Sequence, residues 1–355
     1  MTRCRLCGYE FVEISKSLGV CVNCLKEDDR ALKIAMESHF KWRRLMGLPP
    51  ELPRDGEVEC NICANECRIP RNGSGYCGVI WNKNGNITSV TGAFNKALLH
   101  WYLDPHPTNC VAEPICPERE HYGFYNLAVF FAGCNLDCLF CQNIEHKHML
   151  TSHKGNLVSA EELANVASDK RVTCVCYFGG DPCPNAFYSI RTSREILRRR
   201  KIRICWETNG LENPRIMKEM ARLSLESGGI VKIDWKAYTP TVYQALTGVN
   251  GERAVERIKE NVKLILDIEG NGEPPLLVVS TLVVPHYIDE HEVFGIASYI
   301  AELNPETPYV LLAFAPQHLM SDVPPTSRRQ MEIAYKAAQK AGLKNVYIGN
   351  PWLLR

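Results

Sequence analysis

Cysteine is the residue that most constrains this chain. The 355-residue sequence contains 17 cysteines, and thirteen of them lie before residue 142. Their number is odd and their spacings repeat the Cys-x2-Cys pattern of metal ligands, which argues against a disulfide framework. The other four, Cys174, Cys176, Cys183 and Cys205, lie in a segment of ordinary composition. The front of the chain is therefore expected to fold around metal, and the rear around a conventional apolar core.

Composition excludes several classes of protein. The sequence is 45% hydrophobic and 23% charged, as in globular proteins, and its formal net charge of +1 argues against a large basic surface for nucleic acid. The longest apolar run, 276–285, is far shorter than the ~20 residues of a membrane helix. The first ten residues, MTRCRLCGYE, lack the apolar core of a signal peptide. A cytoplasmic location without a membrane partner is predicted.

The rear of the chain alternates apolar runs with helical patterns. Ser159 and Glu162 form a capping-box signature at the start of one such helix. Seven apolar runs are typical of buried parallel strands, and they cover 126–133, 171–180, 202–210, 229–237, 276–285, 309–316 and 345–350. This pattern predicts an α/β fold, either a full or partial (β/α) barrel or an open doubly wound sheet. In a barrel the chemistry lies at the carboxyl ends of the strands.

Four segments are predicted along the chain. Residues 1–26 form a zinc-ribbon-like Cys4 module, and 27–55 form a helical linker that ends at two prolines. Residues 56–125 form a Cys-rich module with a second metal site, and 126–355 form the barrel.

The sharpest motif is Cys134-x3-Cys138-x2-Cys141, which directly follows the first barrel strand. Three thiolates on one loop can hold three corners of a [4Fe–4S] cluster and leave one iron without a protein ligand. S-adenosylmethionine fits that open position through its amino and carboxylate groups, and a reduced cluster can cleave it to a 5′-deoxyadenosyl radical. A zinc knuckle or three buried thiols are the alternatives.

These motifs resemble a known family. Residues 126–350 are similar to the radical S-adenosylmethionine superfamily, in its branch of pyruvate formate-lyase activating enzymes. Residues 60–145 resemble the AmmeMemoRadiSam-like group, in which a segment similar to CNICANECRIPRNGSGYCGV precedes a cluster loop ending in CQN. The resemblance implies a barrel of the radical SAM type, with Cys134, Cys138 and Cys141 as cluster ligands and Phe140 near the adenine.

The resemblance also assigns the remaining cofactor contacts. The GGDP element resembles the family's GGEP, which receives the methionine amino group, and Asp181 replaces the more frequent glutamate. In DWK, which resembles D-x-K, the lysine meets the S-adenosylmethionine carboxylate. The residues concerned are Gly179, Gly180, Asp181, Pro182, Asp234 and Lys236, with Thr208 and Asn209 of ETNG completing the pocket. GGDP alone is also typical of a turn, and Asp234 with Lys236 of a structural ion pair.

A second set of cysteines lies at the start of the chain. Cys4-x2-Cys7 and Cys21-x2-Cys24 are separated by 13 residues and supply four thiolates for one tetrahedral ion. Structural zinc is favoured, with a rubredoxin-like iron site as the alternative. Arg3 and Arg5 are thin evidence for docking to nucleic acid or another partner.

A third set is Cys60-x2-Cys63-x3-Cys67-x9-Cys77, which could hold zinc or an auxiliary iron–sulfur cluster. Its spacing does not separate the two. Cys110 and Cys116 could complete a nearby site or be buried free thiols, and Cys183 lies beside the predicted pocket. The cysteines at 174, 176 and 205 are expected to be barrel packing. His146 and His148 are expected to lie on the surface, with a contact to the cofactor as the alternative.

The sequence thus predicts an oxygen-sensitive radical enzyme that abstracts hydrogen from an unactivated carbon of a peptide or protein, including glycyl-radical activation. A low-potential donor such as ferredoxin or flavodoxin would supply the electron. A cobalamin-dependent C-methyltransferase is the enzymatic alternative, although the chain has neither a GxGxxG nor a DxHxxG string. A zinc-ribbon nucleic-acid-binding protein and an iron–sulfur electron-transfer protein are the alternatives from other classes.

Overall fold

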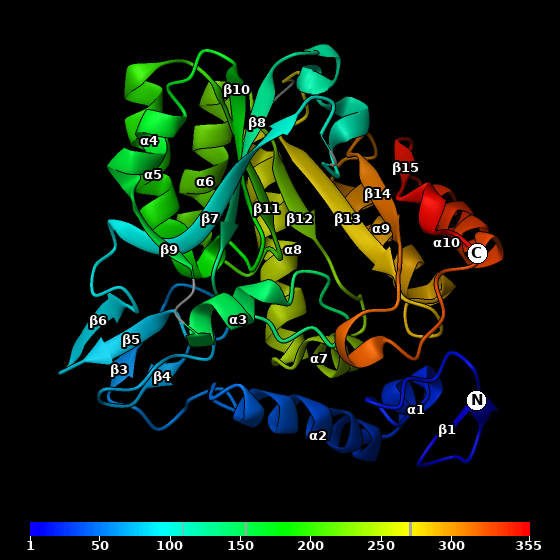
Figure 1. Cartoon of the computed structure of the whole chain (residues 1–355). Coiled ribbons are helices and arrows are strands. Elements are labelled where there is room, and N and C mark those ends of the chain that lie inside the picture. Colours follow the sequence, from blue (N-terminus) through cyan, green and yellow to red (C-terminus); the bar gives the residue numbers. More distant parts are fainter. Residues whose placement is uncertain (109, 153–154, 270–271) are drawn as a thin grey trace.

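Nine strands form one mixed sheet at the centre of the molecule (Figure 1). The computed structural model describes residues 1–108, 110–152, 155–269 and 272–355. The strand order is β15-β14-β13-β12-β11-β10-β8-β7-β9. Seven neighbouring strands run parallel to one another, and they are β8 (Tyr125–Phe131), β10 (Val172–Phe178), β11 (Arg203–Thr208), β12 (Val231–Asp234), β13 (Leu277–Val283), β14 (Tyr309–Ala313) and β15 (Val346–Gly349).

The parallel strands follow one another across the sheet in chain order, as the strands of a barrel do. A doubly wound sheet reverses its order at a switch point, so that alternative is wrong. Within the described residues, β15 and β9 each pair with one neighbour only, which leaves the barrel open. The seven predicted strands and the α/β partial barrel are therefore confirmed.

Helices cover the outer face of the sheet. They are α4 (Ala160–Val166), α5 (Ala186–Arg199), α6 (Pro214–Ser227), α8 (Gly251–Glu269), α9 (Glu290–Leu303) and α10 (Arg328–Lys340). Trp206 of β11 donates from Nε1 to the Met220 carbonyl of α6 over 3.0 Å, and the ring of Tyr177 stacks on Trp206. Because neighbouring residues of a strand point to opposite faces, Cys176, Cys205 and Glu207 face the barrel interior.

Two further strands extend the sheet beyond β8, one from upstream of the predicted barrel and one from within it. β7 (Lys96–Pro105) pairs antiparallel with β8, and β9 (Asn156–Ser159) pairs antiparallel with β7. Both strands carry exposed and buried residues without a continuous apolar run. The hydrophobic pattern therefore did not predict them. The predicted capping box at Ser159 and Glu162 is present at the start of α4.

The segments before β7 lie mainly along the end of the barrel where the parallel strands finish. Figure 1 shows α2 (Asp29–Leu45) running beneath α3 (Glu145–Ser152) and α7 (Pro240–Thr247). The smaller elements of this part are β1 (Thr2–Arg3), β2 (Glu10–Phe11), α1 (Val22–Glu27), β3 (Val58–Glu59), β4 (Arg68–Ile69), β5 (Ile80–Lys83) and β6 (Asn86–Ser89). Asp28 caps α2 by accepting a hydrogen bond from the Arg30 amide.

Short 3-10 helices complete the chain. They are η1 (Glu113–Ile115), η2 (Pro117–Glu120), η3 (Cys183–Asn185), η4 (His318–Met320) and η5 (Pro351–Leu353). In the described ranges, every helix is too short or too polar to cross a membrane.

Candidate functional site

A cavity of about 160 Å³ opens at the carboxyl ends of the parallel strands. It is lined by eleven of the residues that the sequence singles out, namely Cys134, Cys138, Phe140, Cys141, Gly179, Gly180, Asp181, Thr208, Asn209, Asp234 and Lys236. Pro182 lies beside it as the residue before η3 and does not line it. Residues that are more than 100 positions apart in the chain thus meet at one place.

The loop that carries the three cysteines is held by a buried carboxylate. Asp137 lies between Cys134 and Cys138 and is 1% exposed. His39 Nδ1 lies 2.9 Å from Asp137 Oδ2, Arg43 Nη1 lies 3.5 Å from Oδ1, and the Lys147 ammonium also contacts Oδ1. Burial opposes ionisation, but the hydrogen bond from His39 and the charges of Lys147 and Arg43 hold the pKa of Asp137 well below its usual range.

Two of these partners come from α2, so the helix ahead of the barrel supports the loop. Arg43 also donates to the carbonyls of Pro49 and Tyr76, and its guanidinium lies 3.4 Å from the centre of the Tyr76 ring. The hydrophobic pattern predicted the apolar face of α2. It did not predict that His39 and Arg43 are buried, because both are polar residues with exposed charged neighbours.

The three cysteines of the loop are neutral thiols unless a cation binds to them. Burial raises the pKa of all three, to about 12 for Cys138, while Lys236 and Lys147 partly oppose the effect. Thiolates are therefore favourable here only beside added positive charge, which iron supplies. Within the described residues, these sulfurs do not belong to any group whose members all lie within 4.8 Å of one another. This spacing argues against one tetrahedral ion, and three thiols on one loop are the number that leaves one iron of a [4Fe–4S] cluster open.

The GGDP turn needs both of its glycines. Gly179 and Gly180 have φ angles of +60° and +54°. A Cβ at Gly179 would lie 2.1 Å from the Phe130 ring, and one at Gly180 would lie 2.2 Å from the Gly133 carbonyl oxygen. The turn thus packs directly against the backbone that leads into Cys134.

Asp181 connects the GGDP turn to the end of β11. Its carboxylate accepts from the amides of Cys183 and Asn209, both at 2.8 Å, and from Thr208 Oγ1 at 3.1 Å. Burial raises the pKa of Asp181 to about 6 despite these donors. Asn209 in turn donates from Nδ2 to Asn135 Oδ1 over 2.7 Å, which extends the network to the cysteine loop.

Charged side chains line the wall opposite. Lys236 Nζ lies 2.5 Å from Asp234 Oδ2 and 5.7 Å from the centre of the Phe140 ring. Lys232 Nζ lies 3.3 Å from Glu207 Oε2, and both residues also line the cavity. The sequence analysis missed Lys232 and Glu207. Lys232 lies two positions before Asp234, and Glu207 lies two positions before Asn209. Because residues two apart on a strand point to the same face, both could have been predicted to line the cavity.

His146 is another lining residue that the sequence analysis misplaced. It was expected on the surface, but α3 buries it to 2% exposure, and its Nδ1 has no hydrogen-bond partner within the described structure. Burial lowers the pKa of His146 to about 3, and Lys147 adds to the effect. His148, two residues later, is exposed as predicted.

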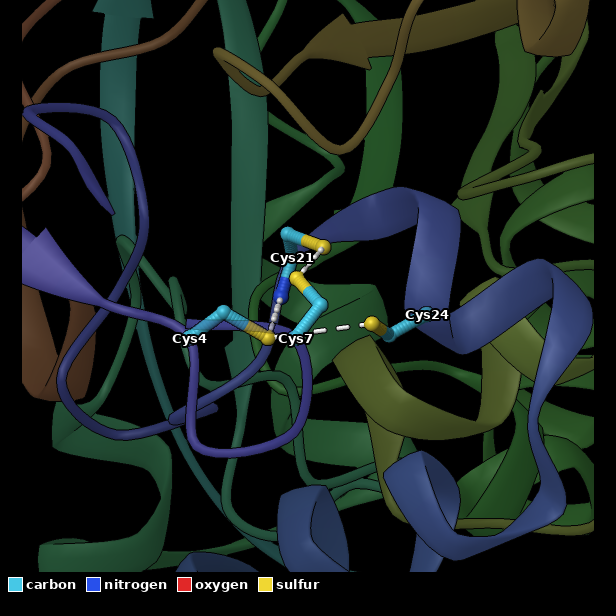
Figure 2. Close-up of side chains that lie close together, drawn as sticks. All are labelled: Cys4, Cys7, Cys21 and Cys24. Carbon is cyan, nitrogen blue, oxygen red and sulfur yellow. Dashed lines mark hydrogen bonds between the residues drawn. The ribbon is translucent and has the colours of Figure 1, made fainter. Parts of the chain in front are cut away.

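The first four cysteines form a compact group at the N-terminus (Figure 2). Cys4 Sγ lies 3.8 Å from Cys24 Sγ, and Cys7 Sγ lies 3.7 Å from Cys21 Sγ. Burial opposes ionisation of Cys4, but hydrogen bonds from nearby backbone amides lower its pKa to about 6. Four sulfurs mutually within 4.8 Å could hold one metal ion.

The Cys60, Cys63, Cys67 and Cys77 set is arranged differently. Cys60 and Cys67 are joined by a backbone hydrogen bond of 2.8 Å, yet the four thiols are not among the compact groups of the described residues. Burial raises the pKa of Cys60, and the other three thiols raise it further, so the four lie within electrostatic reach of one another. Cys63 also hydrogen-bonds to the buried Cys183 beside the GGDP turn.

The fold and the lining of the cavity define a class of protein: a partial β/α barrel with three cysteines at the carboxyl ends of its strands that could hold a metal cluster. Residues 128–300 match the Radical SAM superfamily, and this part of the chain is a radical SAM domain. The family implies a [4Fe–4S] cluster and S-adenosylmethionine, and it indicates an enzyme.

The chain is similar in sequence to one known protein and in fold to two solved structures. An uncharacterised protein of Methanocaldococcus jannaschii is 27% identical over 315 residues, which cover 83% of this chain and 82% of that protein. A domain of pyruvate-formate lyase-activating enzyme from Bacteroides vulgatus superposes with a TM-score of 0.39 at 20% identity, covering 50% of this chain and 98% of that one. Streptococcus suis SuiB bound to precursor peptide SuiA superposes with a TM-score of 0.44 at 15% identity, covering 61% and 46%.

Proposed function

We propose that the protein reductively cleaves S-adenosylmethionine in the cavity at the strand ends, and that the 5′-deoxyadenosyl radical abstracts hydrogen from a carbon of a peptide or protein. The observation that carries this proposal is the convergence of three thiols, the GGDP turn and Lys236 on one cavity. When bound, a [4Fe–4S] cluster with one open iron supplies the electron that breaks the sulfonium–carbon bond, and methionine leaves.

The residues of the chain have separate tasks in this proposal. Cys134, Cys138 and Cys141 hold the three ligated irons. Lys236 offers an ammonium group to the carboxylate of S-adenosylmethionine, since its pair with Asp234 uses only part of its capacity to donate. The Phe140 ring, buried beside Lys236, offers an apolar face for the adenine.

Part of the cavity wall is closed to water. Leu282 and Leu312 line the cavity, and Asp181, Thr208 and Asn209 are each at most 4% exposed. A reactive carbon radical needs such exclusion, because water and solvent-borne donors would quench it.

The peptide or protein substrate is the finer part of the proposal. It is supported by the resemblance of residues 126–350 to the branch of pyruvate formate-lyase activating enzymes, whereas the Cys-rich segment before them departs from the short activating enzymes. Zinc at Cys4, Cys7, Cys21 and Cys24, and a metal or cluster at Cys60, Cys63, Cys67 and Cys77, are proposed as additional sites of the same chain.

The test is anaerobic. Protein reconstituted with iron and sulfide, then reduced, should form 5′-deoxyadenosine from S-adenosylmethionine, and the Cys141→Ala variant should form none. Adding the macromolecular fraction of a cell extract should accelerate formation, while the fraction of small molecules should not. Acceleration by small molecules alone would overturn the substrate class, and transfer of a methyl group to the substrate would assign the methyltransferase alternative. A fully loaded cluster without any 5′-deoxyadenosine in either fraction would contradict the proposal as a whole.

A further inference from the structure

The strand β7 has a free edge beside the candidate active site. β8 pairs with β7 from Leu99 to Pro105, whereas β9 pairs with it only from Lys96 to Leu99. Within the described residues, the far edge of β7 from His100 to Pro105 therefore has no neighbouring strand. Figure 1 shows β7 as the long strand that leaves β9 and runs along β8. The backbone groups at such an edge are a template for pairing with another chain.

The backbone groups that face this edge belong to Trp101 and Leu103. The Leu98 carbonyl accepts a hydrogen bond from the Ala132 amide over 2.9 Å, so the backbone of Leu98 faces β8. The direction alternates along an antiparallel strand, and Trp101 and Leu103 consequently face away from β8. In the ranges that the structure describes, the amides and carbonyls of these two residues have no hydrogen-bond partner on that side. They are free to pair with a further strand.

Two aromatic side chains are exposed at the same edge. Trp101 is 38% exposed and Tyr102 is 44% exposed. Successive side chains of a strand point to opposite faces, so the two rings lie on opposite sides of the free backbone. Proteins usually protect an exposed edge with charges, prolines or bulges, and they place tyrosine and tryptophan where another molecule binds. The exposed rings therefore indicate a binding edge.

A line of rings connects this edge to the cavity that contains Cys134. The His100 ring stacks on Phe130 with 4.6 Å between the ring centres, and Phe130 meets Phe178 edge to face at 5.7 Å. Tyr102 also meets Phe178 edge to face, at 6.3 Å. Phe178 lines the cavity. The face of β7 with His100 and Tyr102 thus continues the cavity wall to the open side of the barrel.

We propose that the free edge of β7 pairs with an extended segment of the polypeptide substrate, which adds a strand to the sheet beside the cavity. Backbone hydrogen bonds with Trp101 and Leu103 hold this segment. Because directly opposite residues of paired strands share a face, every second side chain of the segment lies with His100 and Tyr102 on the side of the cavity. The inference rests on the polypeptide substrate of the proposed function, and it is independent of the radical chemistry.

The edge also defines what the segment looks like. Each residue of a strand spans about 3.4 Å, so the free part of β7 pairs with a segment of about five residues. Main-chain hydrogen bonds accept any residue except proline, and they supply the affinity of this kind of recognition. The rings of His100, Tyr102 and Phe178 favour apolar or aromatic side chains at alternate positions.

The experiment measures peptide binding to the full chain after reconstitution with iron and sulfide, without reduction and without S-adenosylmethionine. The probe is a library of random peptides of about ten residues, which includes the expected segment and its flanks. Peptides selected on the wild-type protein are synthesised, and fluorescence anisotropy gives their Kd. Methylating one peptide amide at a time should weaken binding at every second position of the central segment, because an edge strand uses alternate amides.

Variants of the protein test the same contact from the other side. Leu103→Pro removes one outward amide and should raise the Kd of each selected peptide about 2- to 13-fold for every hydrogen bond lost. Tyr102→Ala should weaken most the peptides with an aromatic residue in the central segment. Leu157→Pro is the matched control and should leave Kd unchanged, because Leu157 is 52% exposed on the edge strand β9 and does not line the cavity.

The methylation scan leaves the protein unaltered, so it decides the question even if Leu103→Pro fails to fold, which circular dichroism melting would reveal. A library without binders, a methylation pattern without a period of two, or an equal Kd for folded Leu103→Pro would overturn the proposal. A wild-type dimer that Leu103→Pro converts to a monomer in sedimentation velocity would also overturn it, since a second copy would then occupy the edge. Binding with the expected pattern but without 5′-deoxyadenosine after reduction would support the edge and contradict the proposed reaction alone.

Discussion

Lys236 holds its ammonium group inside the thiol-lined cavity, 2.5 Å from Asp234 and close to the Phe140 ring. Burial by itself would lower the pKa of this lysine, but the charges of Asp234 and Cys138 raise it overall, so the side chain is cationic at neutral pH. A cation in a partly desolvated cavity attracts a carboxylate more strongly than the same cation on the surface.

Lys236→Met should therefore weaken binding of S-adenosylmethionine while the cysteines still take up iron. A hydrogen bond to a charged group contributes about 1.5–3 kcal/mol, which corresponds to a rise in KM of about 13- to 160-fold. Steady-state formation of 5′-deoxyadenosine gives KM, and iron content gives cluster loading. Lys336→Met is the matched control, because Lys336 lies on α10 with a 70% exposed side chain. Equal KM values for the two variants would contradict the assigned role.

The charge of Asp137 stabilises the cysteine loop through buried ion pairs with Arg43 and Lys147. Asp137→Asn leaves Arg43 and Lys147 buried without their counter-ion, which should lower the free energy of unfolding by about 3–5 kcal/mol. Anaerobic urea denaturation measures the change. Glu332→Gln removes an exposed partner of Lys336 and should cost less than about 1 kcal/mol. A loss at Asp137 as small as that of the control would refute the role of the buried network.

Among the elements, the parallel strands were predictable because most of them, such as β8, β10, β13 and β14, are apolar runs that are buried on both faces. The motifs at the strand ends were predictable because the carboxyl ends of parallel strands meet at one edge. β7 and β9 were not, since their residues alternate irregularly between exposed and buried. The burial of His146 on α3 and of Arg43 on α2 was also missed. Both side chains are polar, and only the packing of these helices in the folded molecule buries them.

The contact between the GGDP turn and the cysteine loop gives a prediction at this scale. Gly180→Ala places a Cβ 2.2 Å from the Gly133 carbonyl oxygen, one residue before Cys134, and should displace the loop and lower the iron bound per chain. Gly47→Ala is the matched control, since Gly47 has a φ of +68° but no atom within 4 Å of an added Cβ. That control should cost about 1–2 kcal/mol and retain full iron. Full iron in the Gly180 variant would show that the loop tolerates the displacement.

At the scale of the whole molecule, the N-terminal cysteine module is attached to the barrel. Tyr287 donates from its hydroxyl to the Val20 carbonyl over 2.9 Å and accepts from the Ser15 amide at 3.0 Å. Lys26 of α1 pairs with Asp289, the residue that caps α9, at 2.9 Å. A segment this short has little core of its own, so a metal at the four cysteines would hold the start of the chain in place for these contacts.

Removing that metal should separate the module from the barrel without emptying the radical site. Cys7→Ser/Cys24→Ser should lose about one zinc per chain and melt at a lower temperature, because four ligands hold one tetrahedral ion. Inductively coupled plasma mass spectrometry gives zinc and iron in the same sample, and calorimetry gives the melting temperature. Unchanged zinc would assign the metal to other residues, and loss of all iron would show that the two parts fold as one unit.

The central claim is that S-adenosylmethionine binds at a cluster held by Cys134, Cys138 and Cys141. EPR of the reduced protein with and without S-adenosylmethionine tests it most directly. We expect S-adenosylmethionine to change the g-values of the cluster signal, and we expect the change to be absent in Cys141→Ala. A cluster signal that stays the same at saturating S-adenosylmethionine would contradict the account.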